Sequence, residues 1–97
     1  MPEMTFDVRW PDGRAQQCYS PSLVMHDYLC ADTDYTVADF VERSGRALAE
    51  ASDRVRAKFG FACTSAAATA EQIQRAAARY PSDAVMHITA MQPPLET

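Results

Sequence analysis

The stretch MTFDVRWPDGRAQQCYS, residues 4–20, decides the fold because it holds two strands and the turn between them. Apolar and polar residues alternate from Met4 to Trp10, which is the period of a half-buried strand. Pro11-Asp12-Gly13 then reverses the chain, since proline presets φ for the first turn position and glycine accepts a positive φ. The sequence therefore predicts a β-hairpin with Pro-Asp-Gly at its tip.

Two registers of this hairpin remain open, and they differ in where Cys18 points. A type I turn followed by a left-handed glycine gives a three-residue loop with a bulge, which places Phe6 opposite Cys18 and turns Cys18 to the core. A two-residue loop puts Ala15, Gln17 and Tyr19 on that face instead. The register matters because a shift by one residue moves every side chain to the other face of the sheet.

The clearest helix begins after Thr36, a good N-cap, and ends at Gly60, which suits a left-handed C-cap. Its apolar residues recur at spacings of three and four, as on the buried side of a helix. Gly45 inside it costs roughly 1 kcal/mol relative to alanine, which suggests a close neighbour at that point. Acidic residues stand four positions before basic ones on its polar side, in the pairs Asp39/Arg43, Glu42/Arg46 and Glu50/Arg54.

The other segments are predicted from shorter signals. Ser20 as N-cap and Pro21 at the first helical position favour a short helix, with a strand as the competing interpretation. Residues 30–35 read as a polar loop. An alanine-rich helix is expected over about 65–80. Residues 84–91, an apolar run that His87 and Thr89 interrupt, are predicted to form a last strand.

This order of elements predicts an α+β fold, in which a small antiparallel sheet, made of the N-terminal hairpin plus the C-terminal strand, is covered by two long helices. The chain of 97 residues is expected to form a single domain over residues 1–92, with a flexible tail over 93–97. A sheet of three strands leaves an open edge, which invites pairing with another copy or with another protein.

Composition excludes several classes of function. The chain is 47% hydrophobic and 23% charged, as in a soluble globular protein, and its net charge of −4 argues against nucleic acid as a partner. No apolar run is long enough to span a membrane, and no secretory signal is evident, so we expect a cytoplasmic protein. Cys18, Cys30 and Cys63 are odd in number and lack C-x-x-C spacing, which indicates reduced thiols.

Two of the cysteines are candidate reactive thiols. Cys63 stands beside the start of the second long helix, where free N–H groups can lower the pKa of a thiol. It could then act as a nucleophile or redox sensor, with Cys18 as its resolving partner. The alternative is that both are small buried core residues, since free cysteine is among the most buried types.

Aromatic residues supply a candidate binding surface, although core packing explains them equally well. The residues are Trp10, Tyr19, Tyr28 and Tyr35. A mixed site built from His26, Cys30 and His87 lacks the paired spacing of zinc ligands, so no metal is expected. No glycine-rich phosphate loop, strained nucleophile turn or paired carboxylates are visible, and we expect no cofactor.

The chain resembles a small bacterial family known as nitrogen-starvation response proteins. The resemblance covers almost the whole chain apart from the last strand and tail. It implies genes beside a nitrilase, a radical-SAM enzyme, an acetyltransferase-like protein and a flavin-dependent oxidoreductase, and a link to nitrogen limitation and the use of nitriles or cyanide. It implies no catalytic residue. The segments that carry it are Met1-Pro2-Glu3-Met4, Arg9-Trp10-Pro11-Asp12-Gly13, Cys18-Tyr19-Ser20-Pro21-Ser22, Asp39-Phe40, Ala51-Ser52-Asp53-Arg54-Val55-Arg56 and Gly60-Phe61-Ala62-Cys63.

The leading hypothesis is a non-catalytic accessory or binding protein that serves the enzymes of a nitrogen-starvation, nitrile- or cyanide-linked pathway. Its partner would be an enzyme of the same pathway, or a second copy in a homodimer. The alternative is a small thiol-dependent enzyme or redox carrier that uses Cys63 and Cys18. The absence of a catalytic constellation in the sequence favours the first.

Overall fold

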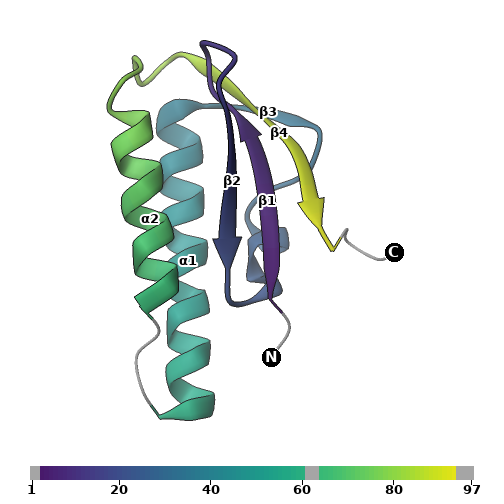
Figure 1. Cartoon of the computed structure of the whole chain (residues 1–97), viewed down its shortest axis with the longest axis vertical. Helices are drawn as coiled ribbons and strands as arrows, with labels where there is room; N and C mark the ends of the chain where they lie inside the picture. The colour runs from purple at the N-terminus through teal and green to yellow at the C-terminus, as the bar shows by residue number, and fades with distance from the viewer. Residues whose placement is uncertain (1–2, 61–63, 94–97) are drawn as a thin grey trace.

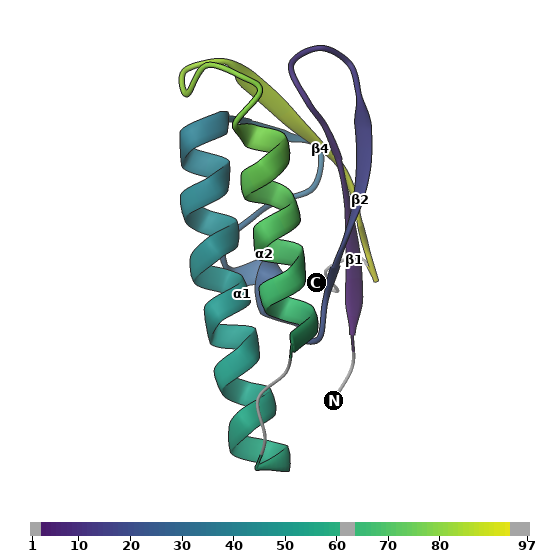
Figure 2. The same ribbon diagram turned by 60° about the vertical axis from the view of Figure 1, so that its left-hand side comes forward.

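The computed structural model of the protein describes residues 3–60 and 64–93. It contains two layers, a four-stranded antiparallel sheet and a pair of long helices, and the predicted α+β class is confirmed. Both helices cover the same face of the sheet (Figures 1 and 2). The strand order is β2-β1-β4-β3, with β1 at Met4–Arg9, β2 at Ala15–Ser20, β3 at Thr33–Thr36 and β4 at Val85–Gln92. The helices are α1 at Val37–Phe59 and α2 at Thr64–Ala77.

The hairpin adopts the bulged register. The backbone N–H of Gly13 donates to the carbonyl of Trp10 at 2.8 Å, and the N–H of Trp10 donates to the carbonyl of Arg14 at 2.8 Å. Gly13 has a φ of +89°, the left-handed conformation that this turn requires. Phe6 therefore faces Cys18 across the ladder, and both side chains point into the core.

The short helix after β2 begins later than predicted. Ser20 stays in β2, paired with Met4, and its hydroxyl donates to the carbonyl of Ser22 at 2.8 Å. Ser22, not Ser20, is the N-cap, and its Oγ accepts from the N–H of Val24 at 3.3 Å. The element is a 3₁₀ helix, η1, at Leu23–Asp27. Pairing with β1 keeps Ser20 extended, so the helix begins only after the next residue whose hydroxyl can cap it, Ser22.

The segment that was expected to be a polar loop contains the strand β3. Tyr35 lies opposite Met86 of β4, and the side chains of Thr33 and Tyr35 are half-buried while Asp34 and Thr36 are exposed. The sheet thus has four strands rather than three. The C-terminal strand is consequently an interior strand, and the edges of the sheet are β2 and β3.

The ends of α1 are those that the sequence predicts. The Oγ1 of Thr36 accepts from the N–H of Asp39 at 3.1 Å, and Gly60 ends the helix with a φ of +78°. The second helix ends at Ala77 rather than near residue 80, and Tyr80 follows in a turn whose N–H donates to the carbonyl of Ala77. The predicted ion pairs are present at 3.0, 3.3 and 4.0 Å, namely Asp39–Arg43, Glu42–Arg46 and Glu50–Arg54.

Among the described residues, no helix combines the length and the apolar character needed to cross a bilayer. The apolar side chains instead meet between the sheet and the helices. The largest fully buried ones are Trp10, Phe6, Phe40, Met4, Met25, Leu29, Leu48, Ile73, Met86, Ile88, Val8 and Val24.

The close neighbour expected at Gly45 is absent, since a Cβ added there would meet nothing within 4 Å. Gly45→Ala is therefore expected to raise the free energy of unfolding by about 0.5–1 kcal/mol, because alanine loses less backbone entropy in a helix. Urea denaturation followed by far-UV circular dichroism measures this. Gly60→Ala is the matched control and should destabilise, since Gly60 has a φ of +78°. Destabilisation by Gly45→Ala would contradict the prediction.

Candidate functional site

The two candidate thiols differ in what the structure says of them. Cys18 is 1% exposed, and burial, reinforced by the negative charge of Asp7, raises its pKa to about 12 although a hydrogen bond from Gln16 lowers it. A thiol in this state is not a nucleophile at neutral pH, because the thiolate is the reactive form. Cys63 lies outside the described residues, so its reactivity stays a prediction. Cys30 is exposed.

The tyrosines fall on two separate parts of the molecule. Tyr28 and Tyr35 are brought together by Arg43, whose Nη1 donates to the carbonyl of Tyr28 at 3.2 Å and whose guanidinium lies 5.4 Å from the ring centroid of Tyr35. Tyr19 is on the sheet face opposite the helices, and its hydroxyl donates to Glu3 at 2.9 Å. Trp10 belongs to neither group.

The histidines do not converge. The Nε2 of His26 lies 2.9 Å from the carbonyl oxygen of Pro93, and Cys30 stands beyond the end of η1. On β4, Nδ1 of His87 lies 2.5 Å from Oδ1 of Asp34, and Nε2 of His87 lies 3.2 Å from Oδ1 of Asp32. Within residues 3–60 and 64–93, no group of three His, Cys, Asp or Glu residues could hold a metal ion.

The first surface with functional potential is the free edge of β2. The strand has six residues, AQQCYS, and none of them is charged or proline. Because hydrogen-bonded pairs alternate along an antiparallel ladder and Trp10–Arg14 is such a pair, the backbone groups of Ala15 and Gln17 point away from β1. The other edge, β3, has only four residues and carries Asp34. Shortness and charge are common protections of an edge strand, and β2 has neither.

The second surface is a pocket between the hairpin and α2, which we call the arginine pocket. Its floor is the ring of Tyr80, stacked on Trp10 with centroids 5.5 Å apart and planes 11° apart. The indole Nε1 of Trp10 donates to Oε1 of Gln16 at 2.9 Å, which fixes the ring. The pocket has a volume of about 290 Å³ and is lined by Trp10, Arg14, Gln16, Gln72, Arg75, Ala76, Arg79 and Tyr80.

Two carboxylates accompany the arginines of this pocket. Glu71 pairs with Arg75 at 2.6 Å, and Asp12 lies 3.9 Å from Arg14. The pKa of Asp12 is lowered mainly by the backbone N–H of Arg14 and next by the hydroxyl of Tyr80, which donates to it. Burial and then this hydrogen bond raise the pKa of Tyr80, so the phenol is neutral and its ring is held in place.

Sequence reasoning identified Trp10 of this pocket but missed its arginines. The available signal was the spacing of Arg75 and Arg79, four apart in the helix that the sequence predicts over about 65–80 and directly before Tyr80. Arg14 follows the hairpin turn, some sixty residues earlier, and only the packing of the hairpin end against α2 brings the two segments together.

Comparison with known proteins assigns the chain to a family. Among curated proteins and among solved structures, none matches. The family model described as nitrogen starvation-induced protein NitG matches residues 5–92. This agrees with the nitrogen-starvation family to which the sequence motifs pointed. Because the match extends from β1 to the end of β4, the protein belongs to the NitG family of nitrogen starvation-induced proteins.

Proposed function

We propose that this protein is a non-catalytic accessory protein of a nitrile- or cyanide-linked pathway, and that it binds an enzyme of that pathway through the free edge of β2. The membership of a nitrogen starvation-induced family supports a role under nitrogen starvation, and the link to nitriles or cyanide is part of the proposal. The observation that carries the binding role is the edge itself, six residues long, uncharged and open on one side.

An edge of this kind binds by strand addition. An extended segment of the partner would continue the sheet. Its main chain would form hydrogen bonds with the backbone N–H and C=O groups of Ala15 and Gln17 that point away from β1, and its alternate side chains would supply specificity. The side chains of β2 on the sheet face opposite the helices are those of Ala15, Gln17 and Tyr19, which are small, neutral or aromatic. Such a surface accepts a partner strand without leaving a charge unpaired.

The partner that fits best is a different protein rather than a second copy. Each chain carries a net charge of −4, so two copies repel one another when they approach. A partner of opposite or neutral charge meets no such barrier. The thiol alternative draws no support from Cys18, whose thiol is buried and protonated at neutral pH.

Gln17→Lys tests the proposal, because a lysine at the centre of an edge strand opposes pairing. We expect binding to the nitrilase or radical-SAM enzyme of the same organism's pathway, measured with purified proteins by biolayer interferometry, to weaken by at least about tenfold. Gln74→Lys is the matched control. It makes the same change of charge at an exposed position of α2 and should leave binding unchanged.

Three outcomes oppose the proposal. Equal weakening by both variants would mean that net charge, not the edge, controls binding. Binding that survives Gln17→Lys would move the contact away from β2. A dimer of the protein alone in light scattering, dissolved by Gln17→Lys, would show that the edge serves self-association.

A further inference from the structure

We infer that the arginine pocket is a binding site for a small organic monocarboxylate with an apolar or aromatic body. This site is separate from the β2 edge, and its ligand is a free small molecule rather than a protein. The inference rests on the three arginines that line the pocket, on the net positive charge that remains after their acidic partners are counted, and on the stacked aromatic rings of its floor.

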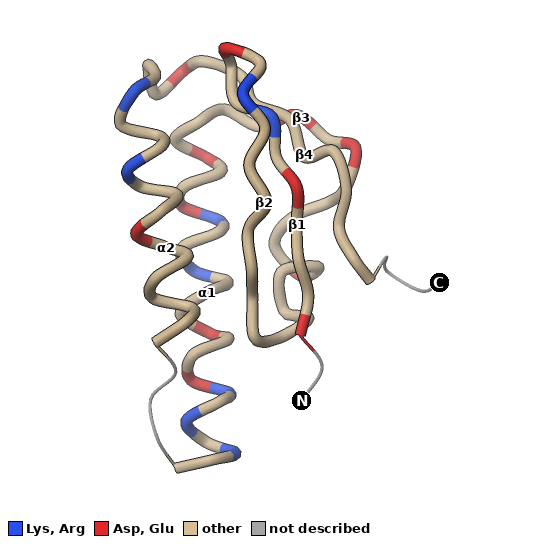
Figure 3. The backbone as a smooth tube through the Cα atoms, viewed as in Figure 1, with Lys and Arg blue, Asp and Glu red and all other residues tan. Residues whose placement is uncertain are grey.

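Positive charge is scarce in this chain, and the pocket holds a third of it. The protein has 9 basic and 13 acidic residues, and three of the basic ones line this single hollow. Figure 3 shows basic positions along the upper part of α2 and in the hairpin. The structure gives Arg79 no ion pair with any residue in the described part of the chain, whereas Arg43, Arg46 and Arg54 on α1 each have an acidic partner.

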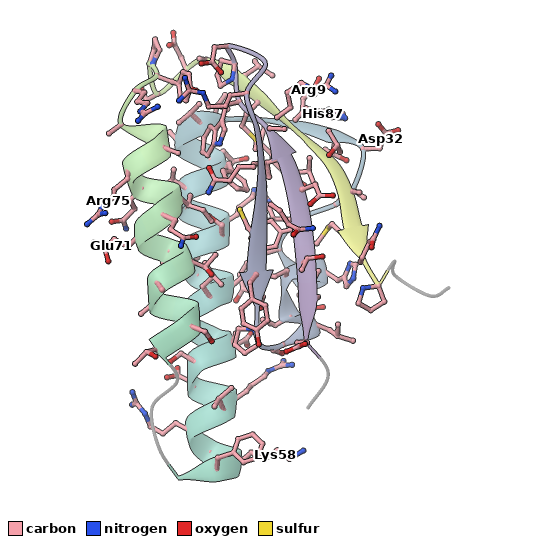
Figure 4. The ribbon with its side chains drawn as sticks, viewed as in Figure 1. Arg9, Asp32, Lys58, Glu71, Arg75 and His87 are labelled. Carbon is pink, nitrogen blue, oxygen red and sulfur yellow. The ribbon has the colours of Figure 1, made fainter. Side chains whose placement is uncertain are left out.

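The balance of charge at the pocket selects a monoanion. The pocket is lined by three guanidinium groups, and two of them have an acidic partner, Asp12 for Arg14 and Glu71 for Arg75. These five charges leave a net charge of +1. Figure 4 shows Arg75 and Glu71 together on the outer side of α2. A carboxylate neutralises this surplus, whereas a phosphate dianion would leave a negative charge uncompensated. Guanidinium groups suit a carboxylate because their planar fork can donate two parallel hydrogen bonds to it.

The floor of the pocket selects the body of the ligand. The stack of Tyr80 on Trp10 offers a flat apolar surface, held at its edges by Gln16 and Asp12. Flat rings and short apolar chains pack on such a surface. The volume of about 290 Å³ lies near the lower end of the range for small-molecule sites.

Trp10 reports on this site because it is the only tryptophan of the chain and part of the pocket floor. The intact protein is titrated with benzoate, acetate and inorganic phosphate at constant ionic strength, followed by tryptophan fluorescence and by calorimetry. We expect saturable binding of benzoate, weaker binding of acetate and the weakest binding of phosphate.

Arg79→Gln removes the unpaired guanidinium and is expected to weaken benzoate binding at least about fivefold. Arg46→Gln, at an exposed arginine of α1 that is not part of the pocket lining, is the matched control and should change nothing. Glu71→Gln raises the local charge to +2 and should strengthen phosphate relative to benzoate.

The inference is overturned if Arg79→Gln and Arg46→Gln bind benzoate equally, or if neither fluorescence nor calorimetry detects saturable binding of benzoate. Phosphate binding as tight as benzoate binding in the unmodified protein would overturn the assignment to a monocarboxylate. None of these outcomes bears on the β2 edge, which is tested by Gln17→Lys.

Discussion

Replacing Phe40 with alanine is expected to lower the free energy of unfolding by about 3–5 kcal/mol. Phe40 is fully buried on the side of α1 that faces the sheet, and its ring meets Trp10 edge to face with centroids 5.7 Å apart. Alanine would leave a cavity beneath the floor of the arginine pocket. A small domain is stable by only about 5–15 kcal/mol, so this single change removes a large part of the total.

Phe59→Ala is the matched control for Phe40→Ala. It makes the same substitution on the same helix, but at a side chain that is 50% exposed. We expect a cost of at most about 1 kcal/mol, because little apolar area leaves the core. Urea unfolding curves at one pH compare the two variants. Equal costs for the two phenylalanines would contradict the packing described for α1.

The parts of the fold that sequence predicted well are those with local causes. Pro-Asp-Gly determines the hairpin loop, because the φ values that it needs are built into Pro11 and Gly13. Thr36 and Gly60 bound α1 by capping groups within a few residues of each end. In each case the deciding interaction lies within four residues of the sequence signal.

The missed strand shows where local reasoning ends. The segment is short and mostly polar, Thr33-Asp34-Tyr35-Thr36. The residue before it, Asp32, has a φ of +56°, a left-handed value that is typical of a loop. What makes the segment a strand is its pairing with β4, some fifty residues later in the chain. The same pairing makes β4 an interior strand, between β1 and β3.

The candidate site shows the same limit. Trp10 and Cys18 were noted because their residue types stand out in the sequence, whereas Arg14 and Arg79 look like ordinary solvated arginines. Their relation appears only when the end of the hairpin packs against α2 beside Tyr80. The hairpin register, left open in the sequence, also decides the chemistry of Cys18, because it turns this thiol into the core.

The buried thiol of Cys18 predicts a loss of stability in alkaline solution. Its pKa rises from an ordinary 9.0 to about 12 in the folded protein. Below pH 9 the thiol is protonated in both states and contributes no pH dependence. Above pH 9 the unfolded chain ionises and the folded one does not, so each further pH unit costs about 1.36 kcal/mol. The loss approaches about 4 kcal/mol at pH 12, and about 2–3 kcal/mol of it should be visible by pH 11.

Urea unfolding at intervals from pH 7 to pH 11, followed by Trp10 fluorescence, measures this slope. Cys18→Ala is the control, because it removes this thiol alone and keeps the other groups that titrate in this range, namely the four tyrosines, the remaining two cysteines and the lysine. The variant starts from lower stability but should lose about 2–3 kcal/mol less than the unmodified protein on going to pH 11. Parallel pH profiles for the two proteins would mean that Cys18 ionises as easily in the folded state as in the unfolded one. In that case burial does not hold the thiol protonated, and Cys18 would again be a candidate nucleophile for the alternative, thiol-dependent function.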